Sequence, residues 1–167
     1  NEAPLRIIEG HNTELKDPHG VAIDTENQWL FVSNHGAVSY SQEGKNFLRV
    51  PQRDGLWVPP GEFERRRLMI PGSGESNPPS ITIYSLNAEG DAAPLRVIEG
   101  PATQFNWPTG LAVDEERGEL YVANDADNSV LVFRTTDSGN AAPIRVIKGS
   151  STGLKNPTGI FADTENQ

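Results

Sequence analysis

Short apolar segments alternate with turn residues along the whole chain. Asp, Asn and Gly stand between the segments, and Asp125 to Asn128 suits a tight hairpin because Asp and Asn tolerate left-handed backbone. Segments of this length, rich in β-branched and aromatic side chains, predict antiparallel strands joined in a meander. The expected strands are Leu5–Glu9, Val21–Ile23, Trp29–Ser33, Gly110–Asp114, Glu119–Asn124, Ser129–Arg134 and Ala142–Lys148.

One stretch occurs three times, at Ala3 to Asp24, Ala93 to Asp114 and Ala142 to Asp163. Each copy carries A-P-[LI]-R-[IV]-I-x-G and then P-x-G-[VLI] with the same internal spacing. The last two copies are 49 residues apart and the first two 90, so the first unit carries an insertion of 41 residues. Four strands per period predict a repeated four-stranded meander, which is the blade of a β-propeller.

The residues of the second unit also resemble a known family. P-T-G-L-A-V-D, E-L-Y-V-A-N and N-S-V-L-V-F follow one another at residues 108–133 and resemble the NHL-repeat class of bacterial β-propeller. The resemblance implies an all-β fold with the P-x-G strand innermost in each blade. It also implies a closed ring of about six blades, of which this chain supplies part.

The expected fold is therefore an all-β partial propeller of about two complete four-stranded blades with flanking strands of neighbouring blades. We expect a fragment of a longer propeller, or a chain whose ring is completed by partners, because exposed strand edges invite pairing. The expected division is an outer strand of a preceding blade at 1–10, a blade at 18–99 interrupted at 35–79, a second blade at 108–148, and an inner strand of the next blade at 157–167.

The insertion at 35–79 stands where the second unit has a four-residue turn. In a propeller, that turn lies on the face where loops between strands gather and ligands commonly bind, which we call the loop face. Three interpretations of the insertion stay open: a partly ordered loop that covers this face, a docking arm for a protein partner, or a lid over a small-molecule site. Arginine and aromatic side chains favour protein interfaces. The candidate partner-binding residues are Arg49, Arg53, Trp57, Phe63, Arg65, Arg66 and Arg67.

Candidate metal ligands gather at the same face. The three histidines belong to the first unit and are not repeated, and imidazole nitrogens bind zinc. Asn34 and Asn124 end the second strand of each unit, where amide oxygens suit calcium. Unliganded surface histidines and structural asparagines are the alternatives, and no cofactor is required by the sequence. The weak candidates for a Ca or Zn site are His11, His19, His35, Asn34 and Asn124.

Repeated acidic residues have a simpler interpretation. Asp24, Asp114 and Asp163 each end the P-x-G strand, and a residue that recurs with the period points to a turn cap rather than a reaction centre. Serine-nucleophile, phosphate-loop and paired His-Glu motifs do not occur in the sequence.

The amino-acid composition limits the classes of partner and the cellular location that we expect. The net charge of −9 argues against nucleic acid or an anionic membrane as partner, and no apolar run reaches the ~20 residues of a membrane span. The absence of cysteine excludes disulfides, and the composition resembles exported bacterial propellers, so we expect an extracellular or periplasmic protein.

We favour a non-catalytic scaffold that binds a protein partner, or the remaining blades of the same propeller, through the loop face and the insertion. One alternative is a metal-dependent lactonase- or lyase-like propeller enzyme. The other is an extracellular sugar- or peptide-binding module with aromatic stacking platforms at Trp29, Trp57 and Trp107.

Overall fold

The computed structural model describes residues 2–35, 38–42, 45–46, 74–76 and 78–164. It divides the chain into two compact units, Asn1–Gly36 with Pro78–Gln167, and Ala37–Asn77. The smaller unit holds a three-stranded sheet of order β4-β3-β5, made of β3 (Val38–Gln42), β4 (Lys45–Asn46) and β5 (Gly74–Ser76).

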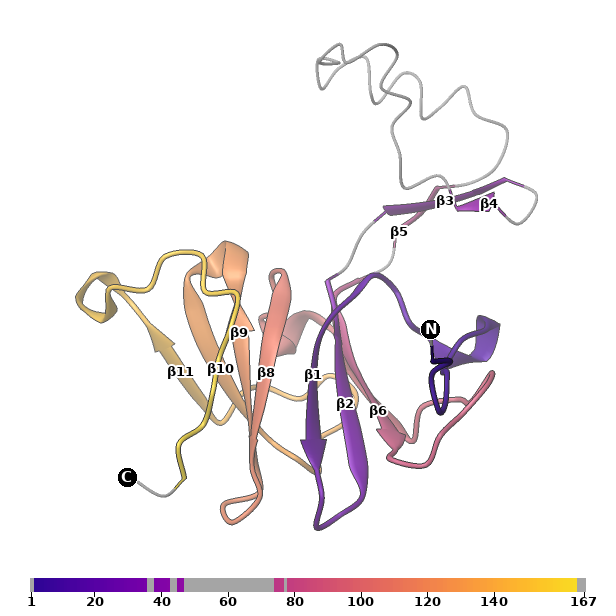
Figure 1. Ribbon diagram of the computed structural model, residues 1–167. Coiled ribbons are helices and arrows are strands. Elements are labelled where there is room, and N and C mark those ends of the chain that lie inside the picture. Colours follow the sequence, from indigo (N-terminus) through magenta and orange to yellow (C-terminus); the bar gives the residue numbers. More distant parts are fainter. Residues whose placement is uncertain (1, 36–37, 43–44, 47–73, 77, 165–167) are drawn as a thin grey trace. The chain divides into compact units, whose positions relative to one another are not determined.

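The larger unit consists of two four-stranded antiparallel sheets (Figure 1). The first has the order β1-β2-β6-β7 and the second β8-β9-β10-β11, so each is a meander. The strands are β1 (Pro18–Asp24), β2 (Trp29–Asn34), β6 (Ser80–Ser85), β7 (Arg96–Glu99), β8 (Pro108–Asp114), β9 (Glu119–Asn124), β10 (Ser129–Arg134) and β11 (Arg145–Lys148).

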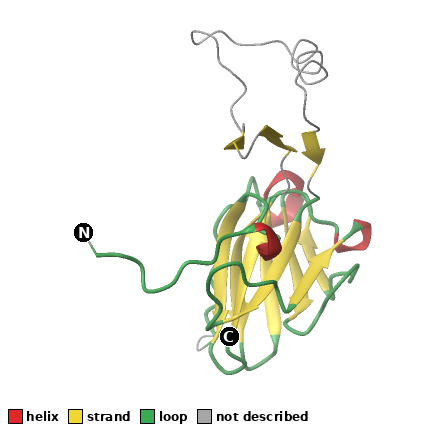
Figure 2. Ribbon diagram, turned by 90° about the vertical axis from the view of Figure 1, so that its right-hand side faces the viewer, coloured by secondary structure: helices red, strands yellow, loops and turns green. Residues whose placement is uncertain are grey.

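The helical elements among the described residues are single 3-10 turns (Figure 2). They are η1 (His11–Thr13), η2 (Pro101–Thr103), η3 (Asp125–Asp127) and η4 (Ser150–Thr152). Within the described part of the chain, no helix has the length and apolar character needed to cross a bilayer.

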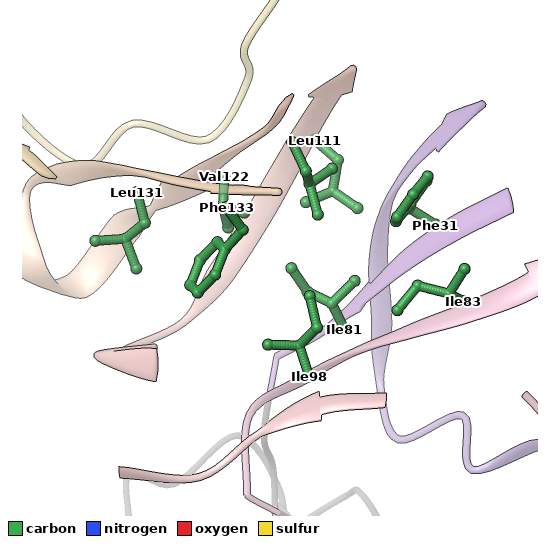
Figure 3. Packing of buried hydrophobic residues seen from close by; sticks show 9 residues of the cluster. Phe31, Ile81, Ile83, Ile98, Leu111, Val122, Leu131 and Phe133 are labelled. Carbon is green, nitrogen blue, oxygen red and sulfur yellow. The ribbon is translucent and has the colours of Figure 1, made fainter. Parts of the chain in front are cut away.

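The two sheets share one apolar core (Figure 3). Alternate residues of a strand point to opposite faces, so each sheet presents one apolar face to the other. The first sheet contributes Phe31, Ile81, Ile83 and Ile98 to the buried cluster. The second contributes Leu111, Leu120, Val122, Leu131 and Phe133.

Strands β1 and β8 lie side by side where the two sheets meet (Figure 1). The Ser33 hydroxyl donates a hydrogen bond to the carbonyl oxygen of Thr109, and a Cβ on Gly20 would stand 2.1 Å from that same oxygen. The contact is therefore backbone to backbone, and a residue without a side chain at position 20 permits it. This explains the glycine of the P-x-G motif and places that strand at the edge of each sheet where the two sheets meet.

A second repeated contact ties each outer strand to the sheet that follows it in sequence. Ile98, in β7, makes an isolated parallel bridge to Gly139, and the Ala102 amide donates to Asn140 at 2.7 Å. One repeat earlier, Ile8 makes the same bridge to Gly90, and the Asn12 amide donates to Asp91.

The strand expected at Leu5–Glu9 does not form as a strand. Apart from the bridge at Ile8 these residues have no ladder, and Leu5 is fully exposed. The physical reason is that a strand needs a hydrogen-bonded neighbour, and no described residue supplies one on the other side. Residues 157–164 likewise form no strand, and 165–167 lie outside the described residues. β11 begins at Arg145 rather than Ala142, since Pro143 has no N–H to donate to a ladder.

The repeated arginines of the A-P-[LI]-R motif bind different partners in the two sheets. Arg145 makes two hydrogen bonds with the Glu119 carboxylate, at 2.7 and 2.6 Å, and this hydrogen bonding lowers the pKa of Glu119. In the first sheet Trp29 stands in place of Glu119, and the Arg96 guanidinium lies over its ring, 4.1 Å from the centroid. Trp29 also packs edge-on against Phe31, so its environment is that of a packing residue.

Candidate functional site at the loop face

The candidate site lies where β1 begins and β2 ends; we call this end of the two sheets, where β8 begins and β9 ends as well, the loop face. The His35 amide donates a hydrogen bond to the Asp17 carbonyl at 3.1 Å. In the second sheet the Asp125 amide donates to the Trp107 carbonyl at the same distance. This repeated backbone contact sets residues 17 and 35 beside each other, whatever side chains they carry.

A β-bulge in β1 turns His19 toward residues 17 and 35. The pairing of β1 with β2 shifts register between Pro18 and Gly20, which leaves His19 outside the regular ladder. Bulges re-aim side chains and are common beside functional sites. In the second sheet the corresponding Thr109 hydroxyl donates to the carbonyls of Ala123 and Pro157. The side chain at this position is therefore structural in the second sheet, whereas in the first sheet the position carries the imidazole of His19.

Three side chains that could bind a metal ion meet here, those of Asp17, His19 and His35. Their donor atoms all lie within 4.8 Å of one another. His19 Nε2 is 3.8 Å from Asp17 Oδ2, and His35 Nδ1 is 3.9 Å from the same oxygen. The two imidazole rings stack with centroids 4.2 Å apart. Trp107 is the second ring that contacts His35, and the centroids of the Trp107 and His35 rings lie 4.8 Å apart.

The electrostatics of the cluster favour a neutral His35. Partial burial lowers the pKa of His35, and the neighbouring His19 lowers it further. The carboxylates of Asp17 and Asp125 oppose this shift without reversing it. A neutral imidazole has a free nitrogen lone pair, which is the form that accepts a hydrogen bond or binds a metal.

The backbone of Trp107 is unusual for so large a residue. Its φ is 60°, in the left-handed region, and the equivalent residues Asp17 and Asn156 have φ values of 63° and 43°. Asp and Asn adopt this conformation readily, whereas for a bulky residue it is an outlier. Trp107 nevertheless stays half exposed. The ring of Trp107 therefore lies at the surface against His35.

Of the sequence candidates, the structure brings His19 and His35 together and leaves His11 outside the group. Asn34 and Asn124 are fully buried and use their amide oxygens within the protein. The Lys16 amide donates to Asn34 Oδ1 at 2.9 Å, and the Asn106 amide donates to Asn124 Oδ1 at 2.7 Å. Each asparagine thus fixes the loop that leads into the inner strand.

Two further sets of residues complete the comparison. Asp24 and Asp114 accept hydrogen bonds from the amides of Asn27 and Arg117, at 2.8 and 2.9 Å, which confirms the turn-cap prediction for both. The predicted partner-binding residues lie outside the described residues: Arg49, Arg53, Trp57, Phe63, Arg65, Arg66 and Arg67.

Sequence reasoning missed Asp17 as a member of the site. The available signal was the alignment of the repeats, in which position 17 is occupied by Asp, Trp and Asn in turn, position 19 by His, Thr and Thr, and position 35 by His and Asp. Residues that keep the period build the blade, so positions that break it are the natural candidates for function.

One stretch of the chain matches a known family of repeats. Residues 105–133 match the family model of the NHL repeat. None of the curated proteins compared matches the chain. Among solved structures, a Lactobacillus plantarum protein from a structural genomics programme is similar with a TM-score of 0.41 and 14% identity, covering 79% of this chain and 26% of that chain. The chain thus spans about a quarter of that protein's length.

The matched NHL repeat runs from the loop before β8 through most of β10, and the first sheet repeats the strand order of the second. The described part of the chain is therefore all-β, with two consecutive four-stranded propeller-like blades, and the second blade contains the stretch that matches the NHL repeat.

Proposed function

We propose that this chain is a protein-binding scaffold whose contact surface is the loop face, centred on Trp107. The observation that carries the proposal is the half-exposed Trp107 ring, held in a left-handed backbone conformation against His35. The match of residues 105–133 to the NHL repeat is consistent with a protein-binding role.

The energetics of Trp107 support this assignment. A side chain held in a sparsely populated backbone region costs about 1–3 kcal/mol and persists where the surroundings fix it, commonly at binding sites. Asn156 occupies the equivalent position with a residue type that the backbone tolerates. A tryptophan at position 107 is therefore unfavourable for the left-handed backbone there, and the exposed half of its side chain adds no burial to the core. Tryptophan is also the residue most enriched among binding hot spots.

The insertion is a second, separate candidate for partner binding. β2 pairs with β6 in the register Asn34↔Ser80, and β9 pairs with β10 in the equivalent register Asn124↔Ser129. The blade thus closes in the same way with and without the added residues, so they are not needed for strand pairing. We assign residues 35–79, with their arginine and aromatic side chains, to partner binding.

The test compares the amount of partner retained by the immobilised wild type with the amounts retained by three variants. Trp107→Ala is expected to weaken partner binding about 30-fold, the effect of losing a hot spot of about 2 kcal/mol. Glu26→Ala is the matched control, because Glu26 is exposed in the turn at the opposite end of β1 and β2 and should leave binding unchanged.

The third variant removes the insertion while keeping the blade. Residues 36–79 are replaced by Ala-Asp-Asn, copied from Ala126–Asn128, so that His35 takes the place of Asp125. Partner binding is expected to fall at least as far as in Trp107→Ala, with the strand content retained in the circular dichroism spectrum. The proposal is wrong if Trp107→Ala and the variant without the insertion retain the same proteins as wild type, in equal amounts.

A further inference from the structure

The Asp17, His19 and His35 cluster has a composition that protein–protein contact alone does not explain. Two imidazoles and a carboxylate converge with donor atoms within 4.8 Å of one another, and all three positions carry other residues elsewhere in the repeat. A set of two histidines and one carboxylate is the ligand combination of many zinc and non-haem iron sites.

The backbone holds this set together before any ligand arrives. The Asp17–His35 backbone hydrogen bond joins two of the positions, and the bulge at His19 brings the third residue to the same side. The Trp107 ring against His35 limits the rotation of that imidazole. Metal sites depend on this kind of support, since ligands held by neighbouring groups lose less freedom on binding.

The three ligand atoms lie near enough to one another to reach one metal ion once the His19 and His35 rings, which are stacked, rotate toward a common point. Ligand atoms on a tetrahedral zinc ion lie about 3.3 Å apart, given bonds of about 2.0–2.1 Å. The two nitrogen-to-oxygen distances are 3.8 and 3.9 Å, and the three donor atoms together lie within 4.8 Å of one another. The nitrogen-to-oxygen pairs must therefore close by about half an ångström, and the pair of imidazole nitrogens by up to about 1.5 Å. His19 and Asp17 are partly exposed and have room to rotate.

The ligand types select the class of metal. Calcium and magnesium take oxygen ligands almost exclusively, whereas imidazole nitrogen favours zinc and the later first-row transition metals. Three protein ligands also leave a coordination position open for water or for a ligand atom from elsewhere. We infer that Asp17, His19 and His35 bind one divalent transition-metal ion of the zinc type at the loop face. This inference goes beyond the proposed scaffold function and does not rest on it.

The experiment titrates Zn²⁺ alone into the full chain after chelator treatment and follows the heat of binding. Wild type is expected to bind one Zn²⁺ per chain. His19→Thr, which installs the threonine of the other repeats, and His35→Ala are each expected to weaken binding at least about 100-fold. His11→Ala is the matched control, because the third histidine of the chain lies outside the cluster and should leave the affinity unchanged.

A second readout reports the ligands directly and does not depend on the variants folding. Cu²⁺ bound to wild type should show hyperfine splitting from two nitrogens in its electron paramagnetic resonance spectrum. The inference is overturned if wild type shows no saturable Zn²⁺ binding, or if His19→Thr and His35→Ala bind Zn²⁺ as tightly as wild type. Neither readout involves a protein partner, so failure here and failure of the scaffold proposal are distinguishable.

Discussion

Gly20→Ala is expected to lower the free energy of unfolding by about 3 kcal/mol, the upper part of the usual range for overpacking. A Cβ at this position would stand 2.1 Å from the Thr109 carbonyl oxygen and 3.0 Å from its carbon. Both atoms belong to the backbone of β8, so no side-chain rotation relieves the clash. The sheets would have to separate, which would strain the hydrogen bond from the Ser33 hydroxyl to the same carbonyl.

The repeat supplies a graded control for this prediction. At Gly110 the equivalent Cβ would stand 2.8 Å from the Thr158 carbonyl oxygen, and at Gly159 it would meet no atom within 4 Å. The losses, measured by urea unfolding, should therefore fall in the order Gly20→Ala, Gly110→Ala, Gly159→Ala, with the last within about 0.5 kcal/mol of wild type. Equal losses at the three positions would show that the close approach of inner strands is not what the motif glycine serves.

Phe133→Ala is expected to cost about 3–5 kcal/mol, the usual cost of removing a fully buried aromatic ring. Phe133 is completely buried in the cluster shared by both sheets, and its ring lies 5.2 Å from that of Phe105. Because the two sheets share this core, the variant should lose stability in one transition.

The matched control is Phe161→Ala, since the Phe161 side chain is 87% exposed and its removal leaves no cavity. That variant should stay within about 0.5 kcal/mol of wild type. Urea unfolding of both variants, followed by tryptophan fluorescence and by circular dichroism, checks the prediction. Two separate transitions in Phe133→Ala, with one retaining its wild-type midpoint, would contradict a core common to the two blades.

The strand pattern of the uninterrupted unit could be predicted from the sequence almost completely. β9 and β10 begin and end where the pattern places them, and Asp125 to Asn128 forms the expected hairpin with Asn128 in the left-handed conformation. These features are local, because each strand carries its own alternation and each turn its own chemistry. The NHL resemblance was confirmed for the same reason, since the matched residues are those that build strands and turns.

Features that depend on distant residues were harder to predict. The segment Leu5–Glu9 has strand-like composition, yet the structure gives it a single bridge because a ladder needs a partner that composition does not reveal. The Trp29–Arg96 contact depends on the order of strands in the sheet.

The candidate site was predictable in part. The meander places His19 and His35 on one face, and the sequence shows that neither residue is repeated. The contact of His19 with Asp17 depends on a bulge in β1, and the contact of His35 with Trp107 depends on how the second sheet packs against the first. Neither a bulge nor an inter-sheet contact has a signature in the hydrophobic pattern. The metal role of these residues and the export of the protein stay predictions.

The central claim is that repeated residues build the blades while Asp17, His19 and His35 are free to serve another role. The most direct test is the thermal midpoint of the triple variant Asp17→Asn, His19→Thr and His35→Asp, in which each position takes a residue found in another repeat. The account predicts a midpoint within about 2 °C of wild type, because the backbone contacts at these positions recur whatever the side chain. A fall of about 8 °C or more would contradict it and make the cluster a structural element of the first blade.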